Sequence, residues 1–262
     1  MKIFGIINIT PDSFSDGGKN FTEPEALKTA EEMLNNGAYA LDLGAESTRP
    51  NAKSITANEE IERLKILLPK LVKENILTSV DTRNFETAKW ALNEGAKIIN
   101  DVSGFKNPNM PLLLKEFNAT GIFMHSLTVP TLPSVVMESQ NFSMIQEIIN
   151  FANKTLHECL EIGVKKEQLI FDCGIGFGKT AEQSIFLIQN IEAFKVTDLP
   201  IFVGHSRKSF LKTAFKERFL ESEPSLYEKD LMTNIFSALM FEKVDFLRVH
   251  NVKLLKSLIA KI

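Results

Sequence analysis

The sequence predicts an α/β fold, a single TIM barrel in which eight parallel strands are surrounded by eight helices. Eight short apolar runs recur along the chain with helical patterns between them, which is the alternation that a closed parallel barrel requires. The length of 262 residues suits a (β/α)8 barrel, which typically takes roughly 250 residues. No linker-like stretch divides the chain, so we expect one domain over residues 1–262.

The expected strands are the apolar runs themselves, each short enough for a strand that is buried on both faces. In chain order they are Lys2–Ile9, Tyr39–Leu43, Leu77–Val80, Lys97–Ile99, Gly121–Met124, Gln168–Phe171, Pro200–Val203 and Phe246–Val249. Polar residues stand at the end of each run. In a barrel the carboxyl-terminal strand ends converge on one mouth, where the active site lies.

The expected helices lie between the strands and carry apolar residues at three- and four-residue spacing. They are Pro24–Asn36, Asn58–Lys73, Asn84–Asn93, Met110–Phe117, Ser143–Ile162, Ala181–Asn190, a stretch from Ser209 onward, and Val252–Ile262. An open doubly wound sheet would have the same local pattern, so periodicity alone does not exclude it. The barrel is preferred because eight units fill the chain, whereas open sheets usually carry fewer strands.

The composition argues against several classes of partner. The net charge of -3 comes from 30 basic and 33 acidic residues spread along the chain, so no polybasic face favours nucleic acid or a membrane. The apolar start reaches Asn8 and Asp12 too soon for a signal peptide or a membrane span. The two cysteines, Cys159 and Cys173, form no Cys-x-x-Cys pair, which fits a reducing cytoplasm. The expected partners are therefore small molecules.

Three carboxylates and an amide stand at the expected strand ends. Asp42, Asp81, Asp172 and Asn100 would form a set of acceptors and amide groups suited to a flat heterocycle that presents several N–H donors. Each could instead cap the helix that follows, since Asp is a good N-cap residue. Four such residues at one rim favour a functional site.

The last two strand ends carry the cations. The segment Ser206-Arg207-Lys208-Ser209 follows one strand, and Arg248 with His250 closes the other. The loops after the last two strands of such barrels commonly bind phosphate, and Arg and Lys supply the donors that phosphate oxygens accept. This pattern predicts a local oxyanion site. No histidine pairs with Ser or Cys and an acid in a way that suggests a catalytic triad.

Two early loops could cover the mouth. The first, Thr10–Gly18, is polar and contains Pro and paired Gly, yet it presents Phe14 and Asp16, which is typical of a lid. An ordinary connection with Phe14 packed on the barrel edge is an equally good interpretation. The second loop, Glu46–Pro50, adds a hydroxyl and an Arg at the same rim.

A glycine-rich stretch, Gly174–Thr180, looks at first like a nucleotide loop. It fits neither a Walker A motif, because Cys173 stands where the first Gly is needed, nor the dinucleotide Gly-x-Gly-x-x-Gly spacing. We expect a tight turn that lets the backbone and Phe177 approach a planar ligand.

The motifs together closely resemble those of the dihydropteroate synthase family of folate biosynthesis. The matching stretches, in the family's order, are Asn8–Gly18, Asp42–Pro50, Ser79–Thr82, Ile99–Gly104, Asp172–Lys179, Ser206–Phe210 and Arg248–His250. The resemblance implies a pterin-binding (β/α)8 barrel that works as a homodimer. It implies that 7,8-dihydropterin-6-ylmethyl diphosphate and 4-aminobenzoate are joined with release of diphosphate, assisted by Mg2+.

The resemblance also implies roles for particular residues. The pterin would be bound by Asp81, Asn100, Met124, Asp172, Phe177, Lys208 and Arg248. The diphosphate would be held by Asn8, Thr48, Arg49, Ser209, Arg248 and His250, with Asn8 also meeting Mg2+. The 4-aminobenzoate would be lined by Phe14, Thr48, Pro50, Phe177 and Ser209. The catalytic residues would be Asp16, Lys208 and Arg248.

The chain departs from the family pattern at three places. Cys173 replaces the usual Pro, Asn251 replaces the usual Asp, and the segment after Met124-His125 lacks the usual Gly-x-Pro. The first two carry no expected ligand contact, so little effect is expected there. Two alternatives remain open. One is a pterin-dependent methyltransferase domain, which would have little use for the Lys208 and Arg248 cations. The other is a non-catalytic pterin-binding paralogue, against which Asn8, Asp16 and Arg248 argue.

Overall fold

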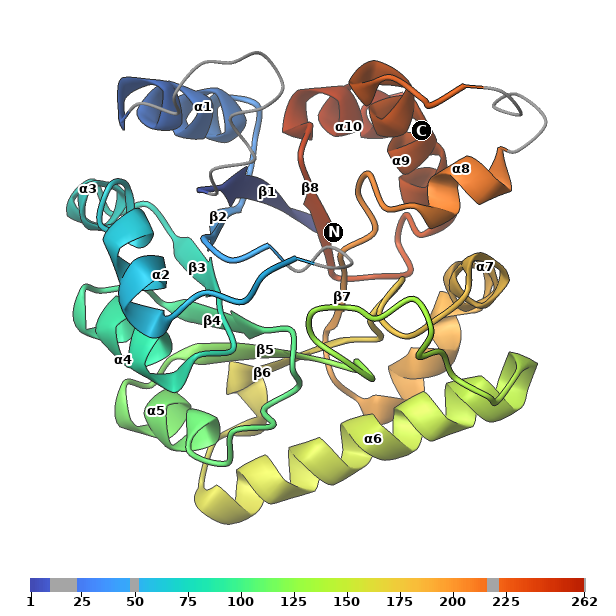
Figure 1. Ribbon diagram of the computed structural model, residues 1–262, viewed down its shortest axis with the longest axis horizontal. Helices are drawn as coiled ribbons and strands as arrows, with labels where there is room; N and C mark the ends of the chain where they lie inside the picture. Colours follow the sequence, from blue (N-terminus) through green and yellow to red (C-terminus); the bar gives the residue numbers. More distant parts are fainter. Residues whose placement is uncertain (10–22, 48–51, 216–221, 262) are drawn as a thin grey trace.

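The strands form a closed parallel barrel, as the sequence predicts (Figure 1). The computed structural model describes residues 1–9, 23–47, 52–215 and 222–261. The strands are β1 (Lys2–Asn8), β2 (Ala40–Gly44), β3 (Thr78–Asp81), β4 (Ile98–Asp101), β5 (Thr120–Met124), β6 (Leu169–Asp172), β7 (Ile201–Val203) and β8 (Phe246–Val249). Because β8 pairs with β1, with Phe4 opposite Arg248, the alternative of an open sheet is wrong.

Helices surround the barrel on its outside (Figure 1). They are α1 (Glu23–Asn35), α2 (Ala57–Leu64), α3 (Leu68–Lys73), α4 (Phe85–Asn93), α5 (Met110–Glu116), α6 (Asn141–Ile162), α7 (Ala181–Gln189), α8 (Phe210–Ala214), α9 (Leu226–Leu239) and α10 (Val252–Ile259), with short 3-10 helices η2 (Lys166–Gln168) and η3 (Ile191–Thr197). Among the helices of the described residues, none is long and apolar enough to cross a membrane.

Two expected helices differ from the structure. The predicted Asn58–Lys73 helix is broken into α2 and α3, because Pro69 has no amide hydrogen and can only stand in the first turn of a helix. The stretch from Ser209 onward contains two helices, the short α8 and the longer α9.

The strands bury both of their faces, and the two faces differ in chemistry. Outward residues pack beneath the helices in one large apolar cluster. Inward residues near the strand starts form a second apolar cluster that fills the lower barrel: Phe4, Ala40, Ile98, Ile122, Ile170 and Phe202, with Leu77 and Phe246 packed against it. The Phe4 and Phe202 rings meet edge to face with their centroids 5.1 Å apart. We call this cluster the barrel floor.

The residues two positions beyond the barrel floor are largely polar. Because strand side chains alternate between faces, these residues also point into the barrel, one layer nearer the mouth. They include Asp42, Asn100, Asp172 and Arg248, each following a floor residue on its own strand. The fold therefore stacks a charged layer directly on an apolar one, and the site is built in that charged layer.

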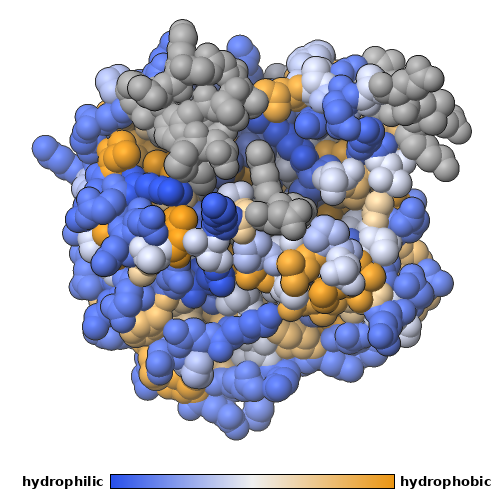
Figure 2. Space-filling view, viewed as in Figure 1, coloured by the Kyte–Doolittle hydropathy of each residue, from blue (hydrophilic) through white to orange (hydrophobic). Residues whose placement is uncertain are grey.

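The visible face of the molecule is mostly hydrophilic toward its outer edge (Figure 2). Hydrophobic residues gather nearer the middle, in the region where the loop between β5 and α6 runs in Figure 1. Leu132 and Val136 of that loop are exposed, and Val129 packs against apolar residues of the barrel mouth. This loop therefore forms an apolar border of the mouth.

Candidate active site

Arg248 of β8 lies at the centre of the site and joins two carboxylates. Its Nε donates to Asp42 Oδ2 at 2.5 Å, and one terminal nitrogen donates to Asp81 Oδ2 at 2.7 Å. The Asn100 amide donates to the same Asp42 oxygen at 3.2 Å. Asp42 is wholly buried, and one of its oxygens has no hydrogen-bond partner among the described residues. Four strands thus contribute to one ionic network inside the mouth.

Gly204, just beyond β7, lies beside this network. A Cβ built there would lie 3.6 Å from Arg248 Cδ and 3.8 Å from Asp172 Oδ2, which are ordinary van der Waals distances. This inward position therefore borders both the Arg248 and the Asp172 side chains.

Asp172 and Lys208 form the opposite side of the site. Asp172, at the end of β6, accepts a hydrogen bond from the Gly174 amide at 2.7 Å. Lys208 Nζ donates to the Ile175 carbonyl at 2.6 Å and lies 4.4 Å above the centre of the Phe177 ring. A cation over an aromatic face is attracted by the negative charge of the ring centre. The amine is thereby held over the glycine-rich loop.

The glycine-rich loop forms the tight turn that the sequence predicts. Gly174, Gly176 and Gly178 all have positive φ, the left-handed region that favours glycine. At Gly174 a Cβ would lie only 1.9 Å from the His125 carbonyl oxygen, so no other residue fits there without a shift of the backbone. The loop is therefore pressed against the end of β5.

An apolar wall completes the pocket. Met124, Phe177 and Val102 form a small buried cluster, with Val129 packed against it. Met124 and Phe177 are expected pterin contacts, whereas Val102 and Val129 were missed, because an isolated valine after a strand carries no chemical signal in the sequence. A flat ring could pack on this wall while its edge met the acids and the amide.

A polar group on the other side of Arg248 suits an anion. Asn8 Nδ2 lies 3.4 Å from His250 Nε2, and the Ser206 hydroxyl lies 3.0 Å from His250 Nδ1. Ser209 is exposed and stands immediately before α8. The structure brings Asn8 and His250 together, and Ser206, which was not among the expected diphosphate ligands, joins them through its contact with His250.

Burial shifts the proton affinities of the site. It raises the pKa of Asp81 to about 7, although the Arg248 cation acts in the opposite direction. It also raises the pKa of Asp172, against the effect of Lys208. Burial lowers the pKa of Lys208 to about 8, opposed by Asp172. For Arg248 burial alone would lower the pKa, but the nearby Asp42 and Asp81 charges outweigh it and raise the pKa.

Five expected site residues lie outside the described residues. They are Phe14 and Asp16 of the first loop and Thr48, Arg49 and Pro50 of the second. Glu46, just before the second loop, accepts two hydrogen bonds from Arg83, each at 3.0 Å. This ion pair ties the chain that leads into the second loop to the end of β3.

Three polar residues at or just beyond strand ends do not face the mouth, contrary to the expectation that all such residues converge there. His125 packs edge to face on Phe151 of α6, and His205 contacts the Thr233 carbonyl and the Ser237 hydroxyl of α9. Asp101 accepts hydrogen bonds from Ser103 and the Phe105 amide within its own loop. The alternation of strand faces sends each of these residues outward.

Arg207 is also turned away from the expected anion site. It forms a paired ionic contact with Asp230 of α9, at 2.6 and 2.9 Å, and Asn251 donates to the same carboxylate at 3.0 Å. At Asn251 the departure from the family pattern therefore supplies a donor to an acid, while Asn251 Oδ1 also caps α10 by accepting from Leu254 N. Cys173, the other departure, lies buried in the core.

The donors available for Mg2+ suit an ion that arrives with a substrate. Asn8 offers one amide oxygen, since its Nδ2 faces His250. Within the described ranges, no group of three or more His, Cys, Asp or Glu could hold a metal ion. Mg2+ is usually bound through one or two protein oxygens together with substrate phosphates and water. The residues present thus fit Mg2+ bound as a diphosphate complex.

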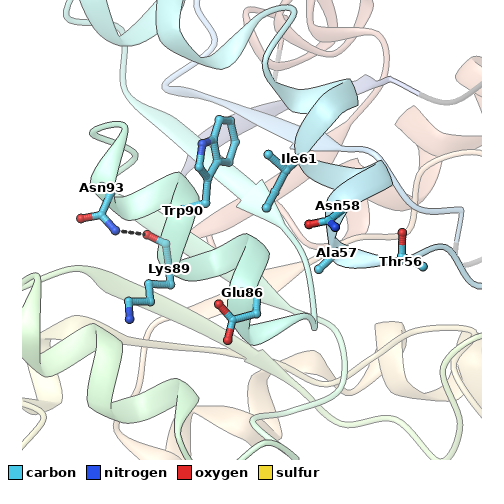
Figure 3. A pocket seen from close by; sticks show the side chains of 8 residues that line it. All are labelled: Thr56, Ala57, Asn58, Ile61, Glu86, Lys89, Trp90 and Asn93. Atoms are coloured by element: carbon cyan, nitrogen blue, oxygen red, sulfur yellow. Dashed lines mark hydrogen bonds between the residues drawn. The ribbon is translucent and has the colours of Figure 1, made fainter.

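Two pockets lie beside or away from the mouth. One of about 370 Å3 is lined by Arg83, Ser103, Lys106, Asn107 and Val129 and therefore adjoins the apolar wall. The other, of about 460 Å3, lies between α2 and α4 on the helical layer, where Figure 3 shows Trp90 beside Ile61 and the Asn93 amide donating to the Lys89 carbonyl. The second pocket carries none of the expected site residues.

This geometry defines a barrel enzyme that binds a planar, N–H-rich ring together with an anion. The family model described as pterin binding enzyme matches residues 4–250. A dihydropteroate synthase of Clostridium beijerinckii is 36% identical over 253 residues, which cover 95% of this chain and 88% of that protein. The chain belongs to the pterin-binding enzyme family and, within it, to the dihydropteroate synthases.

Two solved structures agree with this assignment. The dihydropteroate synthase of Anaplasma phagocytophilum, with bound 6-hydroxymethylpterin-monophosphate, has a TM-score of 0.86 and 34% identity, and the match covers 100% of this chain and 99% of that one. That of Xanthomonas albilineans, with 4-aminobenzoic acid, has a TM-score of 0.87 and 27% identity, covering 99% and 91%.

Proposed function

We propose that this transferase joins 7,8-dihydropterin-6-ylmethyl diphosphate to 4-aminobenzoate. The bond between the exocyclic methylene carbon and the diphosphate oxygen breaks, and its electron pair leaves with diphosphate. The amine nitrogen then attacks the cationic methylene and loses a proton, which gives 7,8-dihydropteroate. The observation that carries the proposal is the meeting of Asp81, Asn100, Asp172, Lys208 and Arg248 in one barrel mouth of a dihydropteroate synthase family member.

The pterin edge would be read by the charged layer of the barrel. Asp81, Asp172 and Asn100 offer carboxylate and amide oxygens to the ring N–H groups, and Lys208 offers a donor to a ring acceptor. Met124 and Phe177 of the apolar wall would contact the ring face. Arg248 would lie beneath the ring, held in place by Asp42.

The diphosphate would be bound on the side of β1 and β8. Arg248 and His250 supply donors, Asn8 lies within reach of His250, and Ser209, which we propose as a further donor, is exposed just before α8. Negative charge on the leaving group grows toward the transition state, so these donors contribute most there. When bound with diphosphate, Mg2+ would supply further neutralisation of that charge.

The second substrate would complete the site from above. Phe177 and Ser209 border the mouth, and we propose that Phe14, Thr48 and Pro50 border the 4-aminobenzoate while Thr48 and Arg49 also contact diphosphate. Asp16 would face the cationic methylene. Closure of this layer would exclude water, which competes with the amine for the cation.

Release of diphosphate in a coupled assay tests the function. With both substrates and Mg2+, the purified protein should release one diphosphate per dihydropteroate formed. Omission of 4-aminobenzoate should abolish the pteroate product. The control variant is Asp198→Asn, a change at an exposed position that precedes the start of β7, whereas the site residues follow the strand ends. Pterin binding without diphosphate release would support the non-catalytic alternative and refute this proposal.

We further propose a cytoplasmic homodimer. Tyr227, Leu231, Ile235 and Leu239 recur every four residues along α9 and are 63%, 39%, 51% and 47% exposed. Residues four apart lie on one face of a helix, so these side chains form an apolar stripe that a second copy could bury. The two cysteines are both buried and unpaired, which suits a reducing compartment.

A further inference from the structure

Lys179 is a buried lysine that the proposed reaction does not use. It follows the glycine-rich loop, just before α7, and only 7% of it is exposed. Its Nζ lies 3.0 Å from His125 Nδ1 and donates to the Phe177 carbonyl at 3.1 Å and the His125 carbonyl at 3.4 Å. An ammonium group has three N–H donors and no acceptor, so these three partners account for all of them.

This arrangement determines the protonation of His125. Because the ammonium can only donate, His125 Nδ1 must accept, and the neutral ring carries its proton on Nε2. Burial, assisted by the Lys179 cation, lowers the pKa of His125 to about 3. Burial lowers the pKa of Lys179 to about 8, so at pH 7 the lysine remains the cation of the pair.

The same contacts reach the proposed pterin site. His125 follows Met124 directly, and Phe177 stands two residues before Lys179, so one amine joins the end of β5 to the loop after β6. Met124 and Phe177 are the two parts of the apolar wall that these segments carry. Lys208 also rests over the Phe177 ring.

We propose that Lys179 is a positioning residue that fixes Phe177 against Met124 and so sets the width of the ring pocket. The expected kinetic effect rests on the proposed function. The contacts among Lys179, His125 and the Phe177 carbonyl do not depend on it. The three partners of its Nζ lie outside the charged layer, although the charge of Lys179 also acts on Asp172 and opposes the rise in the pKa of that carboxyl.

Steady-state kinetics of Lys179→Met test the consequence. Methionine keeps the length of the side chain and removes all three donors. The KM for the pterin diphosphate should rise about tenfold, the factor that about 1.4 kcal/mol of lost binding gives, while kcat should change less than about twofold. Binding contacts that are equal in the ground and transition states affect KM alone.

Lys154→Met is the matched control, because Lys154 lies on α6 with an exposed side chain and pairs with Glu158 at 3.8 Å. Its kinetics should equal those of the wild type. A folded Lys179→Met protein with unchanged KM for the pterin diphosphate, or with a loss confined to kcat, would overturn the proposal.

Nitrogen NMR of the histidine rings in the wild-type protein tests the contact between Lys179 and His125 directly and needs no turnover. The His125 signals, assigned by their loss in His125→Gln, should show a protonated Nε2 and an unprotonated Nδ1 at pH 7. A proton on Nδ1 would overturn the proposed role of Lys179 and leave the proposed reaction untouched. Absence of diphosphate release by the wild type would instead contradict the proposed reaction and leave this measurement valid.

Discussion

Arg248 shows how individual residues create this site from buried charge. Two carboxylates hold its guanidinium at 2.5 and 2.7 Å, and the more deeply buried of them, Asp42, also receives the Asn100 amide. A buried arginine with fixed partners keeps its charge and orientation at any pH of interest. Asp81 and Lys208, in contrast, have pKa values moved toward neutrality, so they are the groups through which pH acts on the site.

Pterin affinity should therefore have a maximum between about pH 7 and pH 8. Below the raised pKa of Asp81, about 7, this carboxyl is protonated and accepts hydrogen bonds poorly. Above the lowered pKa of Lys208, about 8, the amine loses its charge. Calorimetry with a pterin that lacks phosphate, from pH 5 to 9, measures both limbs.

The variant Asp81→Asn should abolish the fall in pterin affinity below about pH 7. It should also weaken binding at pH 7.5 by about 2 kcal/mol, since it removes the charge of one partner in a buried set of charged groups. An affinity that stays constant from pH 5 to 9 in the wild type would show that neither group meets the ring.

Gly174→Ala should destabilise the protein by at least about 3 kcal/mol, because it combines a left-handed backbone with a clash against a carbonyl. The φ of Gly174 is 72°, and its Cβ would meet the His125 oxygen at 1.9 Å. Denaturant unfolding followed by the fluorescence of Trp90, the chain's single tryptophan, measures the loss.

Gly204→Ala is the matched comparison for stability. Its Cβ would have nearest contacts of 3.6 Å or more, so its unfolding free energy should change by less than about 1 kcal/mol. Similar losses in both glycine variants would contradict the steric argument for Gly174.

At the scale of secondary structure elements, contacts between helices and loops hold neighbouring units of the barrel together. Asp230 of α9 binds Arg207 of the loop after β7 and Asn251 at the start of α10. Its carboxylate is almost wholly buried, so a single acid connects two successive units of the barrel. The loop that it anchors carries Lys208 and Ser209.

Asp230→Ala should lower the free energy of unfolding by about 3 kcal/mol or more, because it leaves the partly buried Arg207 cation without its partner. Lys208 and Ser209 should be misplaced as well, which raises the KM for the pterin diphosphate. Thermal unfolding and kinetics of the same variant measure both effects. If Asp230→Ala is as stable as the wild type, the Arg207 guanidinium must become hydrated without a loss of unfolding free energy, which would contradict this prediction.

Much of the fold could be predicted from the elements of the sequence. Each predicted strand overlaps an observed one, because short apolar runs bounded by polar residues leave few alternatives. The helix break at Pro69 could have been predicted from the missing amide hydrogen alone. It is harder to predict which side chains of a strand point into the barrel, because an error of one residue in the strand position moves every side chain to the opposite face.

Site residues could be predicted from the sequence only where a polar side chain also points into the barrel. The structure brings Asp81, Asn100 and Arg248 together in the mouth with Asp172 near them, because polar side chains at inward positions near the strand ends all point into the barrel. Arg207, His125 and His205 look equally functional in the sequence, yet they serve contacts with helices. Their partners lie 23 or more residues away, so no local pattern reveals them.

At the scale of the whole molecule, α9 carries an exposed apolar face that packing on the barrel does not explain. The apolar stripe on α9 supports the proposed homodimer. Ile235→Asp, in the middle of the stripe, should convert a dimer into a monomer at micromolar concentration, because a carboxylate in an apolar interface loses its water without gaining a partner. Light scattering after size-exclusion chromatography measures the mass.

Lys154→Met on α6, outside the stripe, should leave the mass unchanged. A wild-type protein that is monomeric at the same concentration would contradict the dimer.

The barrel floor has a consequence for the order of events. Phe4, Phe202 and their neighbours seal one end of the barrel, so the mouth is a dead end through which every molecule must both enter and leave. The proposed ring site lies immediately above that seal, and the aromatic amine would sit between the ring and the solvent. We therefore expect the pterin diphosphate to bind before the 4-aminobenzoate, and the product to leave past the same rim. In a barrel that is closed at one end, the substrate that binds second would lie nearest the open mouth.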